Sequence, residues 1–197
     1  MEIAVIILAA GGSKRLGRPK QLLPFHGGSL LRRAAEAAVG SHADHCTVVL
    51  GNAAESCGAE VANLPLRLEV NPGWRDGLAS SIRAGMNAVR RHHPDLDAVI
   101  LAPCDQPFLS SAVLNSLMQV HLSTDSGIVA SSYAETLGVP ALFSAAWFER
   151  LASLQGDRGA KVLFDTAGAG LISVPFPQGA TDVDTAEDYA GALAVEG

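Results

Sequence analysis

The sequence has little cysteine, few aromatic residues and no long apolar run. Its three cysteines, Cys46, Cys57 and Cys104, form no Cys-x-x-Cys pair, which argues against a disulfide framework and against a zinc site. No apolar run approaches the ~20 residues of a membrane helix. Glu2 precedes the apolar run at 3–9 without a basic segment, so neither a secretory signal nor a membrane partner is expected. These features together favour the reducing cytoplasm.

Positive charge is also scarce, because 14 lysine and arginine residues face 20 acidic ones and the net charge is −6. A nucleic-acid partner is therefore not expected, since such binders are usually basic. Four of the cations nevertheless lie close together in the chain: Lys14, Arg15, Arg18 and Lys20. That concentration in an acidic protein predicts one local site for an anion. With 197 residues and 48 % apolar side chains, we expect a single domain over residues 1–197.

Apolar patterning predicts strands that alternate with helices. The run from Ile3 to Ala9 is apolar on both faces, as in a strand buried inside a parallel sheet. We expect further strands at 47–51, 66–70, 98–102, 127–132 and 141–143. We expect helices at 30–39, 53–63, 78–91, 110–122, 146–154, 160–166 and 186–195. This alternation predicts an α/β fold with three layers, α/β/α, and a mostly parallel sheet.

A glycine-rich, cationic loop at 11–20 follows the first strand directly. Its glycines allow backbone conformations that other residues avoid, and exposed N–H groups in such a loop can hold phosphate oxygens. Arg15 and Lys20 add positive charge for the same purpose. A flexible surface turn with solvated charges is the alternative. The loop is no P-loop, because Arg18-Pro19 replaces Lys-Ser/Thr, and it lacks the Gly-x-Gly-x-x-Gly pattern.

Acidic residues follow the fourth predicted strand and precede the last predicted helix. Ligands of parallel α/β sheets gather at the carboxyl ends of the strands, so we expect Asp105 and the glycine-rich loop at one rim. A carboxylate there suits Mg²⁺, which prefers oxygen ligands. Near the C-terminus, Asp182 and Asp184 share a face of an extended chain. Capping of neighbouring helices is the alternative role for Asp105 and Asp184.

The segment from residue 8 to 20 matches every fixed position of the pattern Leu-Ala-Ala-Gly-x-Ser-x-Arg-x-Gly-x-x-Lys. It therefore resembles the signature of MobA-like nucleotidyltransferases, which implies a Rossmann-like GT-A nucleotidyltransferase fold. The resemblance implies that Arg15 and Lys20 are catalytic and contact a triphosphate. It also implies a set of nucleotide-binding residues in this segment: Leu8, Ala9, Ala10, Gly11, Gly12, Ser13, Arg15 and Lys20.

A second segment resembles the Asn-Pro-x-Trp-x-x-Gly-Met-x-Ser-Ser stretch of molybdenum cofactor cytidylyltransferases, with Leu78 in place of Met. It implies four further nucleotide-binding residues: Asn71, Gly77, Ser80 and Ser81. A tight helix–sheet contact with an N-cap is the alternative for the small residues at 77 and 79–81. We favour Trp74 as a core anchor over a platform for the base. The resemblance continues in order at 103–107, 138–140, 156–161 and 182–188. Val139 stands where histidine is common.

The resemblance further implies that Asp105 is catalytic and that Asp105 and Asp184 bind Mg²⁺ or Mn²⁺, although the residues alone leave the choice between Asp182 and Asp184 open. The implied reaction moves CMP from CTP to the phosphate of a molybdopterin-type cofactor and releases pyrophosphate. The implied partners are CTP, a pterin-phosphate cofactor, and a molybdenum hydroxylase or its chaperone. The preference for CTP over GTP rests on Ala10 and on the segment 104–106.

We assign nucleotide binding to about residues 1–107 and acceptor binding to about residues 108–197. One alternative is cytidylyl or guanylyl transfer to another phosphorylated acceptor, such as a sugar phosphate or an isoprenoid-precursor phosphate. A different alternative is a non-catalytic carrier of the molybdenum cofactor. A pure carrier needs no triphosphate–metal site, so the presence of Lys20, Asp105 and Asp184 together argues against it.

Overall fold

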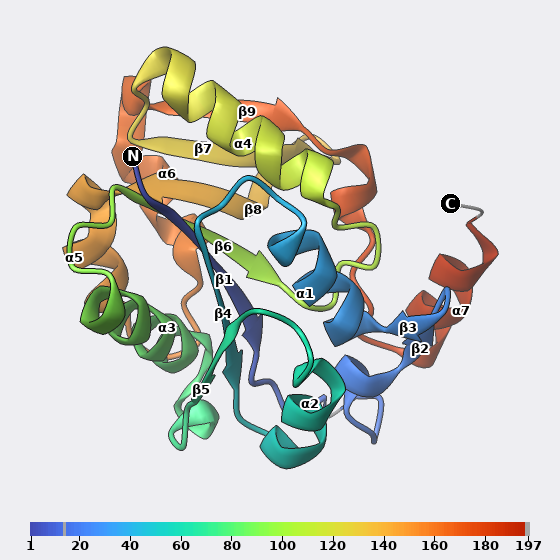
Figure 1. Ribbon diagram of the computed structural model, residues 1–197. Helices are drawn as coiled ribbons and strands as arrows, with labels where there is room; N and C mark the ends of the chain where they lie inside the picture. Colours follow the sequence, from blue (N-terminus) through green and yellow to red (C-terminus); the bar gives the residue numbers. More distant parts are fainter. Residues whose placement is uncertain (14, 196–197) are drawn as a thin grey trace.

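The computed structural model describes residues 1–13 and 15–195, and its centre is a seven-stranded sheet in the order β5-β4-β1-β6-β8-β7-β9 (Figure 1). The strands are β1 (Ile3–Ala9), β4 (His45–Leu50), β5 (Arg67–Val70), β6 (Ala98–Pro103), β7 (Ile128–Tyr133), β8 (Thr136–Ser144) and β9 (Leu171–Pro175). All neighbours pair in parallel except β8, which is antiparallel to both β6 and β7. The predicted α/β fold with a mostly parallel sheet is therefore confirmed.

Helices cover both faces of this sheet and complete the three layers. They are α1 (Leu30–Val39), α2 (Ala54–Val61), α3 (Leu78–His92), α4 (Ser111–Thr124), α5 (Phe148–Ala152), α6 (Phe164–Ala167) and α7 (Ala186–Ala194). Short 3₁₀ turns are η1 (Lys20–Leu22), η2 (Trp74–Asp76), η3 (Ala145–Trp147), η4 (Ala160–Leu163), η5 (Gly168–Gly170) and η6 (Pro177–Ala180). The helix expected at 160–166 is thus divided into η4 and α6. Within the described residues, no helix combines the length and the apolar content that a bilayer span requires.

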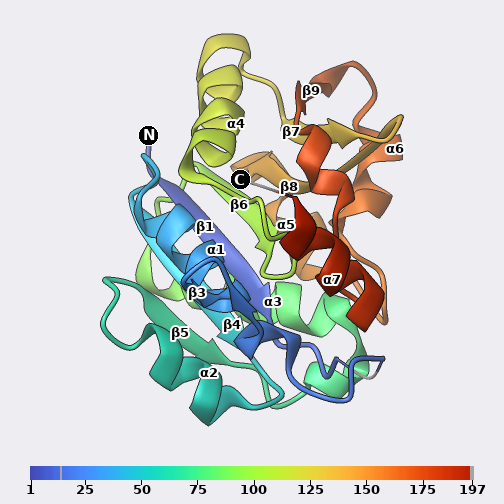
Figure 2. The same ribbon diagram turned by 90° about the vertical axis from the view of Figure 1, so that its right-hand side faces the viewer.

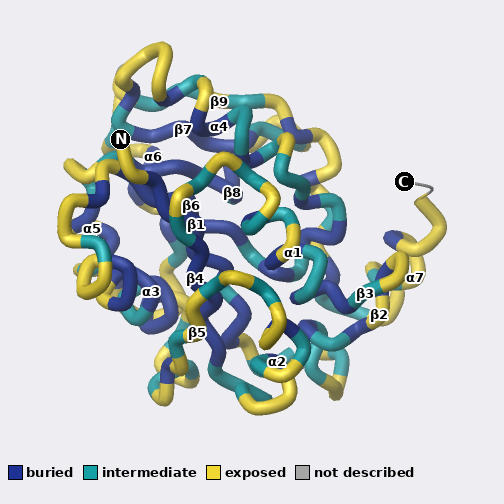
Figure 3. Tube along the Cα trace, viewed as in Figure 1, coloured by how far each residue is buried: buried dark blue, intermediate teal, exposed yellow. Residues whose placement is uncertain are grey.

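The core lies on both faces of β1, as its continuous apolar sequence requires. Val5 and Ile7 contribute to a cluster that includes residues of α1, α2 and α4, while Ala4 and Ile6 contribute to a second cluster with residues of α3, α5 and α6. All four side chains are fully buried. Figure 3 shows the central strands as buried segments between more exposed helices and loops. Burial from both sides fixes the direction of β1 and therefore the position of the loop that follows it.

Two features of the sheet differ from the sequence-based expectation. The strand expected at 141–143 extends over Thr136–Ser144, and its direction is reversed by a hairpin in which Ala134 and Glu135 adopt positive φ. A further strand, β9, pairs in parallel with β7. A short apolar run does not reveal its strand direction, since only the tight turn before β8 specifies it. The reversed strand brings Val139 to the carboxyl end of β6.

A separate small element joins the two ends of the chain. The hairpin of β2 (Pro24–Phe25) and β3 (Gly28–Ser29) was not expected, and it packs against the C-terminal region. Phe25 and Leu30 form a buried cluster with Val183 and Ala192, and the Tyr189 hydroxyl donates to the Pro24 carbonyl. Figure 2 turns the side of the molecule that carries α1 and α7 toward the viewer. This cluster holds the segment before α7 beside the N-terminal loop.

Gly85 in α3 provides a test of the packing between the helix and the sheet. A β carbon at Gly85 would lie 2.6 Å from Ile6 Cγ2 and 3.0 Å from Val49 Cγ2. We expect Gly85→Ala to lower the free energy of unfolding by about 1–3 kcal/mol, because overpacking forces the backbone apart. Urea denaturation followed by circular dichroism measures this change.

The matched control is Gly191→Ala in α7, where a β carbon would meet no atom within 4 Å. This substitution should leave the stability unchanged or raise it by up to about 1 kcal/mol, because alanine favours the helix over glycine. Equal stability of Gly85→Ala and the wild type would contradict the tight approach of α3 to β1 and β4.

Candidate active site

Three charged side chains from distant parts of the sequence meet at the carboxyl end of the sheet. Lys20 Nζ lies 2.5 Å from Asp105 Oδ2 and 2.7 Å from Asp184 Oδ1, although these partners are 85 and 164 residues away in the sequence. Arg15 Nη2 lies 2.6 Å from the other oxygen of Asp184. The Lys20 side chain is only 14 % exposed, whereas that of Arg15 is 67 % exposed. The structure thus brings the predicted catalytic residues and both predicted metal ligands together.

The glycine-rich loop is fixed by hydrogen bonds from polar residues at its two ends. Ser13 Oγ accepts from the backbone N–H of Lys20 at 2.9 Å. Gln21, which is 1 % exposed, donates from Nε2 to the carbonyls of Ala9 (2.9 Å) and Gly11 (2.8 Å). Sequence reasoning missed Gln21, and the one available signal was a polar residue between the signature lysine and an apolar pair. Gln21 therefore positions the loop through two backbone carbonyls, and its Oε1 accepts from Ser13 Oγ at 3.4 Å.

The C-terminal segment is attached directly to the residue that follows β6. The backbone N–H of Val183 donates to the Asp105 carbonyl at 3.0 Å, which places Asp184 beside Asp105. Gln106 is buried and donates from Nε2 to the carbonyls of Val139 and Gly179, each at 3.0 Å. These bonds join the end of β6 to β8 and to η6. The turn at 103–107 is therefore the junction through which the two halves of the site are aligned.

The charged side chains at this junction shift one another's pKa values. Burial lowers the pKa of Lys20, but the carboxylates of Asp105 and Asp184 outweigh burial and raise it above its usual range, so the ammonium stays charged. Burial raises the pKa of Asp184, but its contacts with Lys20 and Arg15 hold the pKa below its ordinary value. Burial and the nearby negative charge of Asp105 raise the pKa of Asp182 to about 6.

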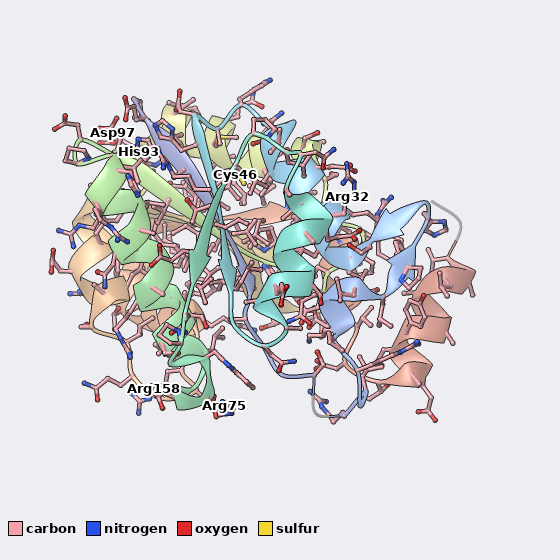
Figure 4. The ribbon with its side chains drawn as sticks, turned by 60° about the horizontal axis from the view of Figure 1, so that its bottom comes forward. Arg32, Cys46, Arg75, His93, Asp97 and Arg158 are labelled. Carbon is pink, nitrogen blue, oxygen red and sulfur yellow. The ribbon has the colours of Figure 1, made fainter. Side chains whose placement is uncertain are left out.

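A cavity of about 880 Å³ opens beside these charges. Its lining includes nine of the predicted nucleotide-binding residues: Leu8, Ala9, Ala10, Gly11, Gly12, Arg15, Lys20, Gly77 and Ser81. Trp74 is half-buried: it packs against the core cluster on the α3 side of the sheet and also forms part of the cavity wall. The Arg75 guanidinium lies 4.4 Å from the centre of its ring system. A β carbon at Gly12 would lie 2.8 Å from Trp74 Cζ3, so this position requires glycine for the loop to contact the indole. Figure 4 shows Arg75 and Arg158 at this end of the molecule.

The other predicted nucleotide-binding residues lie beside the cavity or behind its wall. Asn71 Nδ2 donates to Ser80 Oγ at 2.9 Å and to Ser81 Oγ at 3.1 Å, and Asn71 and Ser80 are each 6 % exposed. Ser13 faces the backbone of Lys20, as described above. Contacts of Asn71, Ser80 and Ser13 with a nucleotide stay predictions. Lys14, one of the four clustered cations, lies outside the described residues.

The residues at the junction fit a hard divalent cation. Oxygens of Asp105 and Asp184 both contact one cationic atom, the ammonium nitrogen of Lys20. Two carboxylates that can contact one ammonium are close enough to share one metal ion. Carboxylate oxygens are the ligands that Mg²⁺ and Mn²⁺ prefer. Asp184 shares this cation with Asp105, and the charge of Asp105 also acts on Asp182, so the choice between Asp182 and Asp184 as the second ligand stays open. Metal binding by these residues stays a prediction.

Comparison with known proteins relates this site to a family. A family model for the MobA-like NTP transferase domain matches residues 5–170. The chain is 33 % identical to the nicotine blue oxidoreductase of Paenarthrobacter nicotinovorans, over 92 % of either chain. It is 36 % identical to the molybdenum cofactor guanylyltransferase of Xanthomonas euvesicatoria pv. vesicatoria, over 57 % of this chain and 52 % of that protein. These relatives do not single out the cytidylyltransferases that the sequence pattern resembles.

Solved structures agree with the family and with the fold. The crystal structure of Rv0371C from Mycobacterium tuberculosis H37Rv in complex with manganese is 30 % identical, with a TM-score of 0.81 over 99 % of this chain and all of that one. A 4-diphosphocytidyl-2C-methyl-D-erythritol synthase from Anaerococcus prevotii is 14 % identical over 98 % of this chain and 95 % of that one, and with a TM-score of 0.78 it shares the fold. Because the family match covers most of the chain, this protein belongs to the MobA-like NTP transferase family and is a nucleotidyltransferase.

Proposed function

We propose that this nucleotidyltransferase moves CMP from CTP to the phosphate of a molybdopterin-type cofactor and releases pyrophosphate. The observation that carries the proposal is the convergence of Lys20, Asp105 and Asp184, of which Lys20 and Asp105 line the cavity bounded by the glycine-rich loop. Two cations and two carboxylates that meet at one edge of this cavity suit a triphosphate with its divalent metal. The manganese complex of the Rv0371C protein supports a divalent cation in this family.

The residues of this chain would act mainly by orientation and charge neutralisation. Backbone N–H groups of the loop and the side chains of Arg15 and Lys20 hold the triphosphate, while Asp105 and Asp184 hold the metal. A bound Mg²⁺ or Mn²⁺ supplies charge neutralisation for the α-phosphate and the leaving group. An acceptor phosphate oxygen forms the new bond to the α-phosphorus as the bond to the β-phosphate oxygen breaks. The acceptor oxygen is already ionised, so no general base is required.

A second cavity, of about 890 Å³, supports acceptor binding in the half of the chain at 108–197. Its lining includes the aromatic residues Tyr133 and Phe164, which suit a flat ring system. Lys161 lines both this cavity and the nucleotide cavity, so its ammonium can reach an acceptor phosphate that approaches the triphosphate. We therefore propose that residues 1–107 bind the nucleotide and that residues 108–197 bind the pterin-phosphate acceptor. The product would then pass to a molybdenum hydroxylase or its chaperone.

A second candidate function is oxidation or reduction with a nicotinamide dinucleotide, since one relative is named an oxidoreductase. The glycine-rich loop and Arg15 would also suit the diphosphate of such a cofactor. The pair Asp105 and Asp184 favours the first proposal, because two carboxylates beside a bare diphosphate would repel it unless a metal lies between them.

The metal requirement of CTP binding tests the site. We expect Asp105→Asn and Asp184→Asn each to weaken CTP binding in the presence of Mn²⁺ by about tenfold or more, because each removes a charged metal ligand. Asp95→Asn, an exposed residue in the loop before β6, is the matched control and should bind like the wild type. Isothermal titration with Mn²⁺ and with a chelator measures the effect. Equal CTP binding in both solutions would refute the role of the carboxylates.

The substrate assignment is tested by pyrophosphate release with each of the four ribonucleoside triphosphates and several acceptors. We expect release with CTP and molybdopterin, and a loss of turnover of about 10³-fold in Lys20→Met, because a cation that neutralises charge on the reacting triphosphate is removed. Turnover with a sugar phosphate alone would refute the acceptor, and turnover with GTP alone would refute the base. CTP binding without turnover on any acceptor would favour the carrier, and oxidation of NADH or NADPH would favour the second candidate.

Lys161 should affect the acceptor more than the nucleotide. We expect Lys161→Met to raise the KM for the acceptor by about tenfold while the KM for CTP changes little. A charged hydrogen bond from lysine contributes about 1 kcal/mol or more to the binding free energy of an anion. Arg150→Met, on the outer surface of α5, is the control for loss of an exposed cation. Steady-state kinetics with one substrate varied at a time separates the two constants. Equal increases in both would place Lys161 on the triphosphate instead.

A further inference from the structure

The opposite end of the sheet carries a cluster of potential metal ligands. Glu2 lies just before β1, His45 is the first residue of β4, and His93 follows the last turn of α3. One ligand atom from each residue lies within 4.8 Å of the other two. The rings of His45 and His93 are stacked, with centroids 3.4 Å apart and planes inclined by 16°. Two imidazoles and a carboxylate therefore occupy one small region.

One nitrogen of this cluster lacks a partner. His45 Nε2 is buried and makes no hydrogen bond within the described residues. Its nearest acidic atom is Glu2 Oε2, at 3.5 Å, which is too far for a strong hydrogen bond. A buried polar atom without a partner is costly, so its presence points to a ligand that the nitrogen is built to contact.

The chain segments that carry the three side chains are held in place. The backbone N–H of Glu2 donates to Asp97 Oδ2 at 2.7 Å, and that of Ile3 donates to Asp44 Oδ2 at 2.9 Å. The backbone N–H of His93 donates to the Val89 carbonyl at 2.8 Å. The ligand set would therefore be completed by rotation of side chains on a fixed backbone. Because an imidazole lone pair lies in the plane of its ring, at least one of the two stacked rings would turn out of the stack to face a shared ion.

We propose that Glu2, His45 and His93 form a binding site for a transition-metal cation of the Zn²⁺ class. Ligand atoms of a tetrahedral zinc site are roughly 3.3 Å apart, because each lies about 2.0–2.1 Å from the metal. The three atoms need to approach one another by about 1.5 Å at most, and a water molecule can supply the fourth ligand. Two nitrogen donors distinguish this site from the all-oxygen pair at Asp105 and Asp184.

The proposed site is separate from the candidate active site. It lies at the amino ends of β1 and β4, whereas the glycine-rich loop leaves the carboxyl end of β1. A strand of seven residues separates the two ends by roughly 20 Å. Figure 4 shows His93 and Asp97 at one end of the molecule and Arg75 and Arg158 at the other. A metal here would tie the starts of two strands to the end of α3, so it would stabilise the fold.

Zinc binding to the untagged full chain tests the proposal. The measurement is competition with a chromogenic zinc chelator, accompanied by thermal unfolding with and without Zn²⁺. We expect one equivalent of Zn²⁺ to bind and to raise Tm, and excess Mg²⁺ should not displace it. Glu2→Gln and His93→Asn should each weaken binding by about tenfold or more, since the loss of a ligand costs at least as much as the loss of an outer-shell partner.

Two controls make the result specific. His92→Asn removes the adjacent exposed histidine and should leave Zn²⁺ affinity unchanged. The double variant Asp105→Asn, Asp184→Asn removes the proposed active-site ligands and should also leave it unchanged. Glu2→Gln and His93→Asn alter partly exposed residues, and their circular dichroism spectra report whether they fold. Zinc affinity that is equal in the wild type and in both folded variants, or that is lost only in a control, would overturn the proposal.

Discussion

The arrangement of this protein depends on one shared cation, the ammonium of Lys20 between Asp105 and Asp184. The Lys20 side chain is only 14 % exposed, so its ammonium is partly desolvated, and two carboxylates compensate for the lost water. Each partner comes from a different segment: the loop after β1, the turn after β6 and the approach to α7. Withdrawal of any one segment would leave an incompletely paired charge, so the ion pairs couple three parts of the chain that share no sequence proximity.

Hydrogen bonds between uncharged groups hold the segments that carry these ion pairs. Gln21 holds the loop through the carbonyls of Ala9 and Gly11, and the Val183 N–H holds the C-terminal segment against Asp105. Glycines give the loop the conformations that it needs for anions, but they leave it with few side chains to pack. A buried glutamine beneath the loop compensates for this deficit with two hydrogen bonds. The glycine-rich loop thus exposes mainly its backbone, and a side chain that faces inward holds it in position.

Much of this arrangement could be predicted from the sequence, because it follows from apolar patterning and strand direction. The run at 3–9 is apolar on both faces, so it had to be a central strand, and parallel pairing then placed the loop and Asp105 at one rim. The reversed direction of β8 could not be predicted, because it depends on two residues with positive φ in the preceding turn. Nor does a motif reveal where its side chains point: Asn71 and Ser80 belong to the predicted pattern, yet they bond to the scaffold.

Family membership indicates nucleotide binding more firmly than it indicates the acceptor. The proposed triphosphate site would use backbone N–H groups, glycines and a few charges, and these requirements are the same for every nucleotide. In the proposed function, an acceptor would be recognised by side chains such as Tyr133 and Phe164, which line the second cavity. Small changes in that lining would alter the shape of the cavity without disturbing the ion pairs at Lys20. Relatives with about one third identity can therefore share the phosphate-binding end of the site while they differ in what they act upon.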